Sequence, residues 1–302
     1  MPPRPSRTFS CHSFQNLAEG RKVVKLQEPE IVFAGSFLVE FRTMSDIFDL
    51  NCDMGESFGV FTIGDDDEVI EYVTSASIAC GVHASDPTVM MGTVRLCKEH
   101  GVMAGAHPGY PDLQGFGRRH IDMAHDDILH SVVYQVGALK GFTALCGMPL
   151  QHVKLHGALY NYVLKNENLF VNIAQAVKEA FGDVVFVTLA TPSSVKLKQR
   201  CRSLGVRIAL EAFPDRAYTD EGTLMPRSSD GAVIRDAGAI ARRAIAMVRE
   251  RCIESVNGRR IACEIDTLCI HSDNGESTLA APLIREYAAR EGIAVRPLGT
   301  FV

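Results

Sequence analysis

Histidines recur in this chain just after short apolar segments, at places where loops can carry chemistry. They are His83, His107, His156 and His271, and each follows a different segment within one to four residues. Turns between strands and helices favour Asp, Asn and Ser, which cap helices and form turns, but such turns do not require histidine. Converging imidazoles can bind a metal ion or transfer protons near neutral pH. The spacing therefore predicts a catalytic pocket assembled from several loops.

Carboxylate, amide and cationic side chains accompany these histidines. The candidate catalytic residues are Asp49, Asp53, Glu56, Asp112, Lys154 and His156. The candidate substrate-binding residues are Asn51, Arg118, Arg119, Asn161, Glu211 and Arg216. Asp86 precedes a proline and a helical pattern, so a helix cap explains it better than a role in the site.

One hypothesis for the pocket is a metal site. His83 and His107, together with Asp49 or Asp53, would form a His/His/carboxylate set, and His271 is a third candidate histidine ligand. A divalent ion held in this way activates water for attack on an amide carbon. Each ligand lies on a separate loop, so the spacing is not a metal motif in itself.

The other hypothesis requires no metal. Asp53 or Glu56 would act as a general base, and Lys154, His156 or an arginine would stabilise the oxyanion. Covalent catalysis is disfavoured, because the chain has no Gly-x-Ser-x-Gly sequence and no cysteine in an evident Cys/His pair. Both hypotheses for the pocket stay open at the level of sequence.

Residues 105–119 contain more glycine and proline than an ordinary connection. This composition lets the backbone approach a ligand closely. Arg118 and Arg119 at its end can bind a carboxylate or a phosphate in bidentate geometry, although a solvated pair of charges also explains them. The Gly-x-Gly here lacks the third glycine of a dinucleotide site, and no Gly-x-x-x-x-Gly-Lys-Ser/Thr phosphate loop occurs, so the chain does not indicate where ATP would bind.

The elements that position these side chains alternate between short apolar runs and longer helical patterns. The predicted strands are residues 47–50, 76–79, 102–106, 152–154, 184–189, 207–210 and 267–270, with a terminal run at 293–295. Helices are predicted over residues 88–100, 126–146, 169–181 and 236–251, and Asn257-Gly258 predicts a hairpin. Repeated strand-helix units predict an α/β fold, a regular or irregular (β/α) barrel. Such barrels carry their active sites at the carboxyl ends of the strands, where the candidate residues fall.

Composition limits the kinds of partner. A formal net charge of -5 and a pI of about 6.1 provide no basic face for nucleic acid or for an anionic membrane. No apolar run reaches the roughly 18 to 20 residues of a membrane span. Nine cysteines without a Cys-x-x-Cys pair predict reduced, buried thiols and a cytoplasmic protein. We expect a small-molecule or protein partner, and a homo-oligomer is compatible with these features.

The first 45 residues differ from the rest. They carry proline, serine and arginine without a periodic apolar pattern, so we expect residues 1–45 to be a poorly ordered N-terminal extension and residues 46–302 to form the barrel domain. A basic, serine-containing leader is compatible with organelle targeting, although Glu19, Glu28 and Glu30 argue against it. A start at Met44 explains the extension equally well.

Seven segments carry a family resemblance. They are DLNCDMGESFGVFTIGDD (49–66), SASIACGVHASDP (75–87), GAHPGYPDLQGFGRR (105–119), YQVGALKG (134–141), HVKLHGALYN (152–161), DRAYTDEGTLMPR (215–227) and DTLCIHSD (266–273). In content and order they resemble the motifs of the LamB/YcsF family, and the resemblance runs from residue 47 to the C-terminus.

The resemblance implies a barrel related in fold to glycoside hydrolases and polysaccharide deacetylases. It also implies a hydrolase that opens 5-oxo-L-proline to L-glutamate with ATP hydrolysis, together with separate B and C subunits. ATP, with Mg²⁺, would then be handled by this chain or by those partners. The polar residues inside the motifs are supported as site residues, but the resemblance assigns no individual roles to them. These residues are Asp49, Asn51, Asp53, Glu56, His83, His107, Asp112, Lys154, His156 and His271.

Some positions depart from the family pattern. The family usually has glycine where Ser85 and Ser272 stand and alanine where Pro214 stands. A serine at a turn that needs a positive φ costs on the order of 1 kcal/mol and would re-aim Asp86 or His271. An altered substrate is therefore compatible with the sequence.

Two other functions stay open. The histidines and the fold kinship permit a metal-dependent deacetylase or amidase that acts on a small N-acyl or carbohydrate substrate without ATP. A non-catalytic binding or scaffold subunit is the third reading. Activity without nucleotide that a chelator abolishes would select the deacetylase, whereas intact assembly activity after changes at His107 and Asp53 would select the scaffold.

Overall fold

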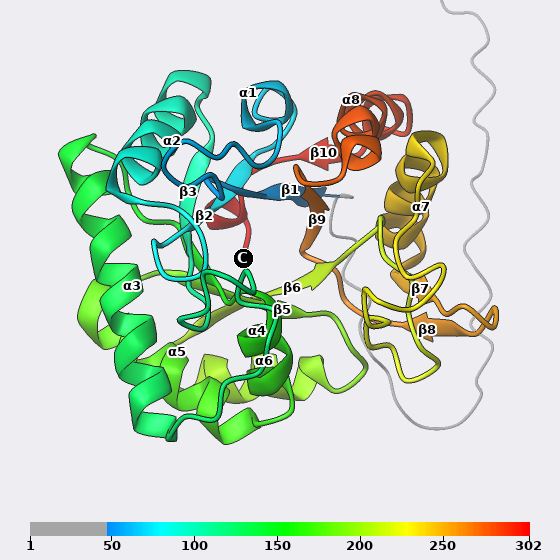
Figure 1. The fold of residues 1–302 in the computed structure, drawn as a ribbon. Helices are drawn as coiled ribbons and strands as arrows, with labels where there is room; N and C mark the ends of the chain where they lie inside the picture. The colour runs from blue at the N-terminus through cyan, green and yellow to red at the C-terminus, as the bar shows by residue number, and fades with distance from the viewer. Residues whose placement is uncertain (1–46) are drawn as a thin grey trace, which may run out of the picture. The chain divides into compact units, whose positions relative to one another are not determined.

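Seven parallel strands close into a barrel in the part of the chain that the computed structural model describes, residues 47–302 (Figure 1). Around the ring they are β1 (Ile47–Met54), β2 (Ser75–Ala79), β3 (Met103–His107), β4 (His152–Lys154), β5 (Val185–Leu189), β6 (Arg207–Ala212) and β9 (Thr267–His271). Strand β1 pairs with both β2 and β9, which closes the ring. The short β10 (Ala294–Val295) adds in parallel to the start of β1. The predicted (β/α) barrel is confirmed.

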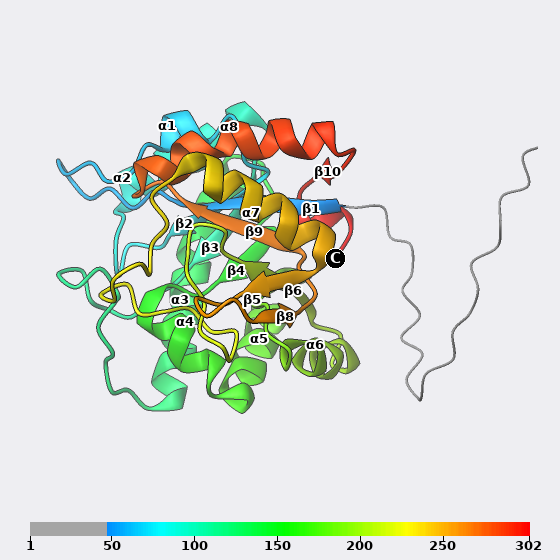
Figure 2. The same cartoon turned by 90° about the vertical axis from the view of Figure 1, so that its right-hand side faces the viewer.

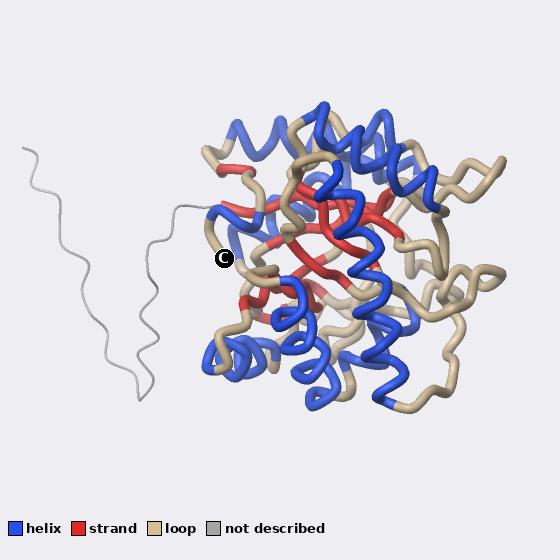
Figure 3. Tube along the Cα trace, turned by 90° about the vertical axis from the view of Figure 1, so that its left-hand side faces the viewer, coloured by secondary structure: helices blue, strands red, loops and turns tan. Residues whose placement is uncertain are grey.

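Helices cover the outside of this barrel, and loops extend from the end at which the strands finish (Figures 2 and 3). The helices are α1 (Asp66–Val69), α2 (Pro87–His100), α3 (His125–Leu145), α4 (Gly157–Leu164), α5 (Glu167–Phe181), α6 (Ser194–Ser203), α7 (Ala237–Glu250) and α8 (Gly275–Arg290). Between α7 and β9 the chain makes an antiparallel hairpin of β7 (Cys252–Glu254) and β8 (Arg260–Ala262), which confirms the turn predicted at Asn257-Gly258. This hairpin stands where a regular barrel would continue its strand-helix alternation.

Three predictions concern parts of the chain other than the barrel. The extension predicted at residues 1–45 lies outside the described residues. Among the helices of residues 47–302, none is long and apolar enough to cross a membrane. The eight cysteines in that range are free thiols, and all except Cys252 are buried, as predicted.

The interior of the barrel is polar, because strand side chains alternate between the two faces of a sheet. In β1 the residues that point inward are Asp49, Asn51 and Asp53. Asn51 Nδ2 donates to Glu211 Oε1 on β6 at 3.0 Å, and Thr267 Oγ1 on β9 donates to Asp49 Oδ2 at 2.6 Å. Polar contacts therefore link the inner faces of β1, β6 and β9.

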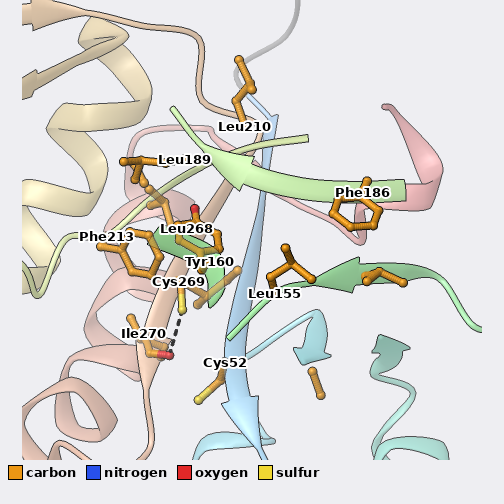
Figure 4. Close-up of a cluster of buried hydrophobic side chains, with 14 of the residues drawn as sticks. Cys52, Leu155, Tyr160, Phe186, Leu189, Leu210, Phe213, Leu268, Cys269 and Ile270 are labelled. Carbon is orange, nitrogen blue, oxygen red and sulfur yellow. Dashed lines mark hydrogen bonds between the residues drawn. The ribbon is translucent and has the colours of Figure 1, made fainter. Parts of the chain in front are cut away.

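The apolar core lies mainly between the strands and the surrounding helices. Figure 4 shows a part of it in which Tyr160, Phe213 and Leu268 pack together. At the opposite end from the long loops, Leu298 of the 3-10 turn η1 (Leu298–Thr300) packs on Val185 and Val187 of β5. The C-terminal segment thus covers the end at which the strands begin, and the polar end is left for chemistry.

The strand ends differ from the sequence prediction in a way that matters for the site. Strand β1 continues past residue 50 to Met54, so Asn51 and Asp53 are strand residues and do not follow the strand. His107 and His271 are likewise the last residues of β3 and β9. The prediction was wrong here because polar residues were taken as strand terminators, whereas this barrel accepts them on its inner face.

Ser85 adopts a φ of +74°, which confirms that its turn needs the left-handed backbone region. The expectation for the other departure was wrong: Ser272 is not among the residues with positive φ, and its single hydroxyl hydrogen is shared between two acceptors, Asp53 O at 3.2 Å and Asp66 Oδ1 at 3.1 Å from Oγ. A serine at this second position therefore ties the loop after β9 to β1.

We expect Ser85→Gly to raise the free energy of unfolding by about 0.5 to 1 kcal/mol. Glycine relieves about 1 to 2 kcal/mol of strain in the left-handed backbone of residue 85. This gain exceeds the loss of about 0.5 to 1 kcal/mol that glycine causes by raising the conformational entropy of the unfolded chain. Urea unfolding measures the change. Ser272→Gly is the matched control, and it should lower stability because it removes a hydroxyl that is shared between two acceptors and relieves no strain. Equal effects of the two substitutions would contradict the strain argument.

Candidate active site

Asp53, one residue before the end of β1, is the residue on which the polar contacts of the barrel mouth converge. Its Oδ1 lies 2.5 Å from Lys154 Nζ, and its Oδ2 lies 3.2 Å from His107 Nε2 and 4.0 Å from His271 Nε2. Burial would raise the pKa of Asp53, but the charges of His107 and Lys154 outweigh burial and hold its pKa well below the ordinary value. Asp53 is therefore an ionised carboxylate inside the protein.

Lys154 at the end of β4 is fully surrounded by acceptors below Asp53. Besides the ion pair, its Nζ lies 2.9 Å from Asn51 Oδ1, 3.1 Å from Glu211 Oε1 and 3.1 Å from Cys269 Sγ. Burial would lower the pKa of Lys154, but the charges around it, first that of Asp53, raise its pKa well above the ordinary value. An ammonium has three N–H donors, and here four acceptors already compete for them. Lys154 therefore holds Asp53 in place and has no hydrogen left for a substrate oxyanion.

His107 and His156 present their lone pairs to each other and to Asp53. The backbone carbonyl of Lys154 lies 2.7 Å from His107 Nδ1, and that of Phe116 lies 2.8 Å from His156 Nε2. A carbonyl can only accept, so each of these two nitrogens carries a hydrogen, and in the neutral form of each ring the opposite nitrogen is bare. The two bare nitrogens, His107 Nε2 and His156 Nδ1, are 2.9 Å apart. Two lone pairs at that distance call for a proton or a cation between them.

Glu56 and His83 carry buried polar atoms that have no partner in residues 47–302. They are Glu56 Oε1 and both ring nitrogens of His83. Glu56 Oε1 lies 3.6 Å from His83 Nε2 and 3.7 Å from His156 Nδ1, and the His83 ring stacks on that of His156 with 3.8 Å between centroids. Unpartnered polar atoms are costly in a protein interior, so their survival here indicates a bound group.

The donor set fits a divalent cation. Asp53, His107 and His156 each offer one ligand atom within 4.8 Å of the others, and so do two further groups, Glu56, His83 and His156, and Asp53, Cys269 and His271. Histidines that ligate metals usually donate their second N–H to a backbone carbonyl, as His107 and His156 do. The geometry therefore favours the metal hypothesis. It groups the ligands differently from the sequence reading, which assigned His156 to catalysis and took His83, His107 and His271 as the histidine ligands.

The carboxylates of Glu56 and Asp53 differ in charge. Burial, and then the nearby charges of Asp53 and Asp273, raise the pKa of Glu56 well above its ordinary value. Burial also lowers the pKa of His83 and of His156 well below that of free histidine. Without a cation, Glu56 thus holds a proton more readily than Asp53, and His83 and His156 hold one less readily than free histidine, so these groups differ as acids and bases.

His271 lies on the far side of Asp53 from His107. Its Nδ1 lies 2.6 Å from Asp215 Oδ2, which also accepts the hydroxyl of Ser277 at 2.9 Å, and its ring stacks on Phe213. Asp215 fixes the orientation of this imidazole, yet it was not among the candidate site residues. Its position three residues after β6 was the available signal.

Several candidate residues are engaged elsewhere. Asp49 sits deeper in the barrel, where it accepts from Thr74, Ser75 and Thr267, and burial raises its pKa to about 6. Such a caged carboxylate supports the barrel interior and does not face the mouth. Its catalytic role stays a prediction.

Asp112 and Arg119 bind each other. Arg119 Nε donates to both carboxylate oxygens of Asp112, at 3.0 and 3.1 Å, and the Gly115 N–H donates at 2.9 Å. The hydrogen bond from Arg119 lowers the pKa of Asp112 to about 2, which makes Asp112 a weak base. This pair closes the loop that carries Arg118.

Asn161 and Arg216 also lie apart from the histidine cluster. Asn161 is exposed on α4. The Arg216 guanidinium donates to the carbonyl oxygens of Met225 and Ala232, so it holds the loop after β6. Their roles in substrate binding stay predictions, as does that of Glu211, which the structure places against Lys154.

Comparison with known proteins supports one family. The model of the LamB/YcsF family matches residues 48–302. A protein of Pyrococcus furiosus, named as the A subunit of 5-oxoprolinase, is 47% identical over 254 residues, which cover 84% of this chain and 98% of that protein. The protein of the same name from Campylobacter jejuni is 41% identical over the same shares. The crystal structure of a lactam utilization protein from Thermus thermophilus superposes with a TM-score of 0.75 at 43% identity, and it covers 82% of this chain and 98% of that one.

Proposed function

Because this chain belongs to the LamB/YcsF family, we propose that it is the lactam-opening subunit of an ATP-dependent 5-oxoprolinase, which converts 5-oxo-L-proline to L-glutamate. The reaction adds one water across the amide C–N bond: the carbonyl carbon gains the oxygen of water, and the ring nitrogen leaves with a proton. A second water is consumed when the coupled ATP is hydrolysed to ADP and phosphate. The observation that carries the proposal is the buried Asp53, His107 and His156 cluster at the barrel mouth, inside the matched region.

The residues of this cluster have distinct tasks in the proposal. Asp53 supplies a fixed negative charge, and Lys154 beneath it fixes the position of that carboxylate. Asp53, His107 and His156 would hold a divalent cation, with Glu56 and His83 beside them. Such a cation lowers the pKa of water and polarises an amide carbonyl.

In this proposal the partner subunits bind the nucleotide. The relatives are named as subunits, which supports an assembly with further chains such as B and C subunits. We assign ATP and Mg²⁺ to those chains; this sequence carries no Gly-x-x-x-x-Gly-Lys-Ser/Thr phosphate loop that would indicate a site here. We also place the assembly in the cytoplasm.

Glutamate release from 5-oxo-L-proline tests the function. Purified chain is assayed with and without ATP and with and without the partner subunits, and the expected result is release only when all are present. Absence of release from a folded chain with partners that are competent with another family member would refute it.

The donor set favours one second candidate, a metal-dependent deacetylase or amidase that needs no ATP. Hydrolysis of a small N-acyl substrate by the chain alone, abolished by a chelator and restored by a divalent cation, would select that function. A scaffold role is the remaining alternative. It requires that His107→Ala and Asp53→Ala leave the activity of the assembly intact.

A further inference from the structure

Above the cluster, one ion pair links two loops from different parts of the chain. Arg118 follows the glycine-rich segment after β3, and Asp273 follows β9, 155 residues later. Arg118 Nη2 donates to Asp273 Oδ2 at 2.9 Å. The same oxygen lies 3.8 Å from Nη1 of Arg227, which belongs to a third loop. Two guanidinium groups thus share one carboxylate oxygen.

Both ends of this bridge are tied directly to the cluster. Phe116, two residues before Arg118, accepts from His156 through its carbonyl, and its ring lies 5.0 Å below the Arg118 guanidinium. Asp273 comes directly after Ser272, whose hydroxyl donates to the Asp53 carbonyl. The bridge therefore lies at the mouth, over a site whose own side chains are buried. Asp53, for example, is only 8% exposed.

A carboxylate from a ligand can replace Asp273 in this bridge. The side chains of Arg118, Arg227 and Asp273 are 40%, 28% and 20% exposed, and exposed ion pairs contribute little to stability. Arginine binds a carboxylate from solution as well as one from the chain, because its planar guanidinium can donate two parallel hydrogen bonds to either. A carboxylate that replaced Asp273 would cost the protein little and would lie beside Asp53 and His156.

We propose that Arg118 and Arg227 form the site for the carboxylate of the substrate, and that Asp273 occupies this site until the substrate displaces it. The inference rests on the proposed function and adds to it a specificity residue, Arg227, and an internal competitor, Asp273. The ring amide of 5-oxo-L-proline is then placed over the cluster by its own carboxylate. A lactam without a carboxylate gains nothing from this site.

Isothermal titration of the purified full chain tests the proposal, with 5-oxo-L-proline and with 2-pyrrolidinone, which has the same ring without the carboxylate. Wild type should bind 5-oxo-L-proline more tightly than 2-pyrrolidinone. Arg118→Gln and Arg227→Gln should each weaken the binding of 5-oxo-L-proline by about 10- to 100-fold and leave that of 2-pyrrolidinone unchanged. Asp273→Asn should bind 5-oxo-L-proline about 3- to 5-fold more tightly, because the competitor is gone.

Matched controls change the same charges away from the mouth. Arg242→Gln removes an arginine of an exposed pair with Asp236, and Asp183→Asn removes a carboxylate paired with Arg207. Neither should change either affinity. Unchanged binding of 2-pyrrolidinone by the arginine variants shows that they are folded, and a gain of affinity in Asp273→Asn shows the same for that variant.

Three results would overturn the proposal. They are equal affinities of wild type for the two lactams, equal losses for both lactams in the arginine variants, and an Asp273→Asn protein that binds 5-oxo-L-proline no better than wild type. Inorganic phosphate is titrated as well, and a larger gain for phosphate than for 5-oxo-L-proline in Asp273→Asn would assign the arginines to a phosphoryl group instead. Binding is measured without ATP or partners, so failure of glutamate release alone would refute the proposed function and not this site.

Discussion

Replacement of Asp53 by asparagine is expected to lower glutamate release by about 10³-fold while the chain stays folded. Asparagine keeps the shape of the side chain and removes its charge. That charge is the one around which Lys154, His107 and His271 are arranged. The neighbouring Glu56 does not readily replace this charge, because burial raises its pKa. The loss should appear in kcat more than in KM, since Asp53 lies below the proposed carboxylate site.

Steady-state assay of the reconstituted assembly measures this effect, and circular dichroism with thermal unfolding verifies the fold. Asp183→Asn, an exposed carboxylate paired with Arg207, is the control for a change of one charge. An Asp53→Asn enzyme that retains a tenth of the wild-type rate would exclude Asp53 from the chemistry and would favour the scaffold reading.

The architecture was predictable because its signals are local. Apolar runs bounded by turn residues predicted the seven barrel strands, and the Asn257-Gly258 turn predicted the extra hairpin. The strand ends were less predictable, because the polar inner face of β1 carries the same residue types as a loop. Only pairing with β2 and β9 shows that Asn51 and Asp53 belong to the strand.

The site was predictable as a set of residues more than as a set of roles. His83, His107 and His156 meet as expected, because strand ends of a parallel barrel converge. Roles depend on which nitrogen is bare and which acceptor is already taken, and these follow from contacts between distant segments. The Phe116 carbonyl that orients His156 and the Asp215 carboxylate that orients His271 are examples. Spacing along the chain cannot reveal such pairs.

The arginines illustrate the same limit. Arg118 and Arg119 are neighbours in sequence and were equivalent candidates for a substrate carboxylate. In the structure Arg119 is bound by Asp112 within its own loop, whereas Arg118 reaches a carboxylate beyond β9. Arg227, from a third loop, joins Arg118 at Asp273; it ends the segment 215–227 that carries the family resemblance but was not among the candidate residues.

Replacement of Lys154 by methionine is expected to destabilise the fold by about 3 to 5 kcal/mol. Methionine fills much of the same volume but removes the ammonium that pairs with the buried carboxylates of Glu211 and Asp53. Because the pKa of Lys154 is raised by those carboxylates against the effect of burial, its ammonium persists throughout neutral pH, and the loss should be present at pH 7. Urea unfolding measures the loss as a lower midpoint at an unchanged slope.

A double substitution separates charge from packing at this position. If unpaired charge causes the loss, Glu211→Gln in the Lys154→Met background should recover about 1 to 3 kcal/mol, although Glu211→Gln alone should destabilise because it weakens the contact with Lys154. Lys196→Met, an exposed lysine of α6, should change stability by less than about 0.5 kcal/mol. If Lys154→Met lowers the free energy of unfolding by less than about 1 kcal/mol, the buried carboxylates take up protons at little cost. That result would contradict the ionised Asp53 on which the proposed chemistry depends.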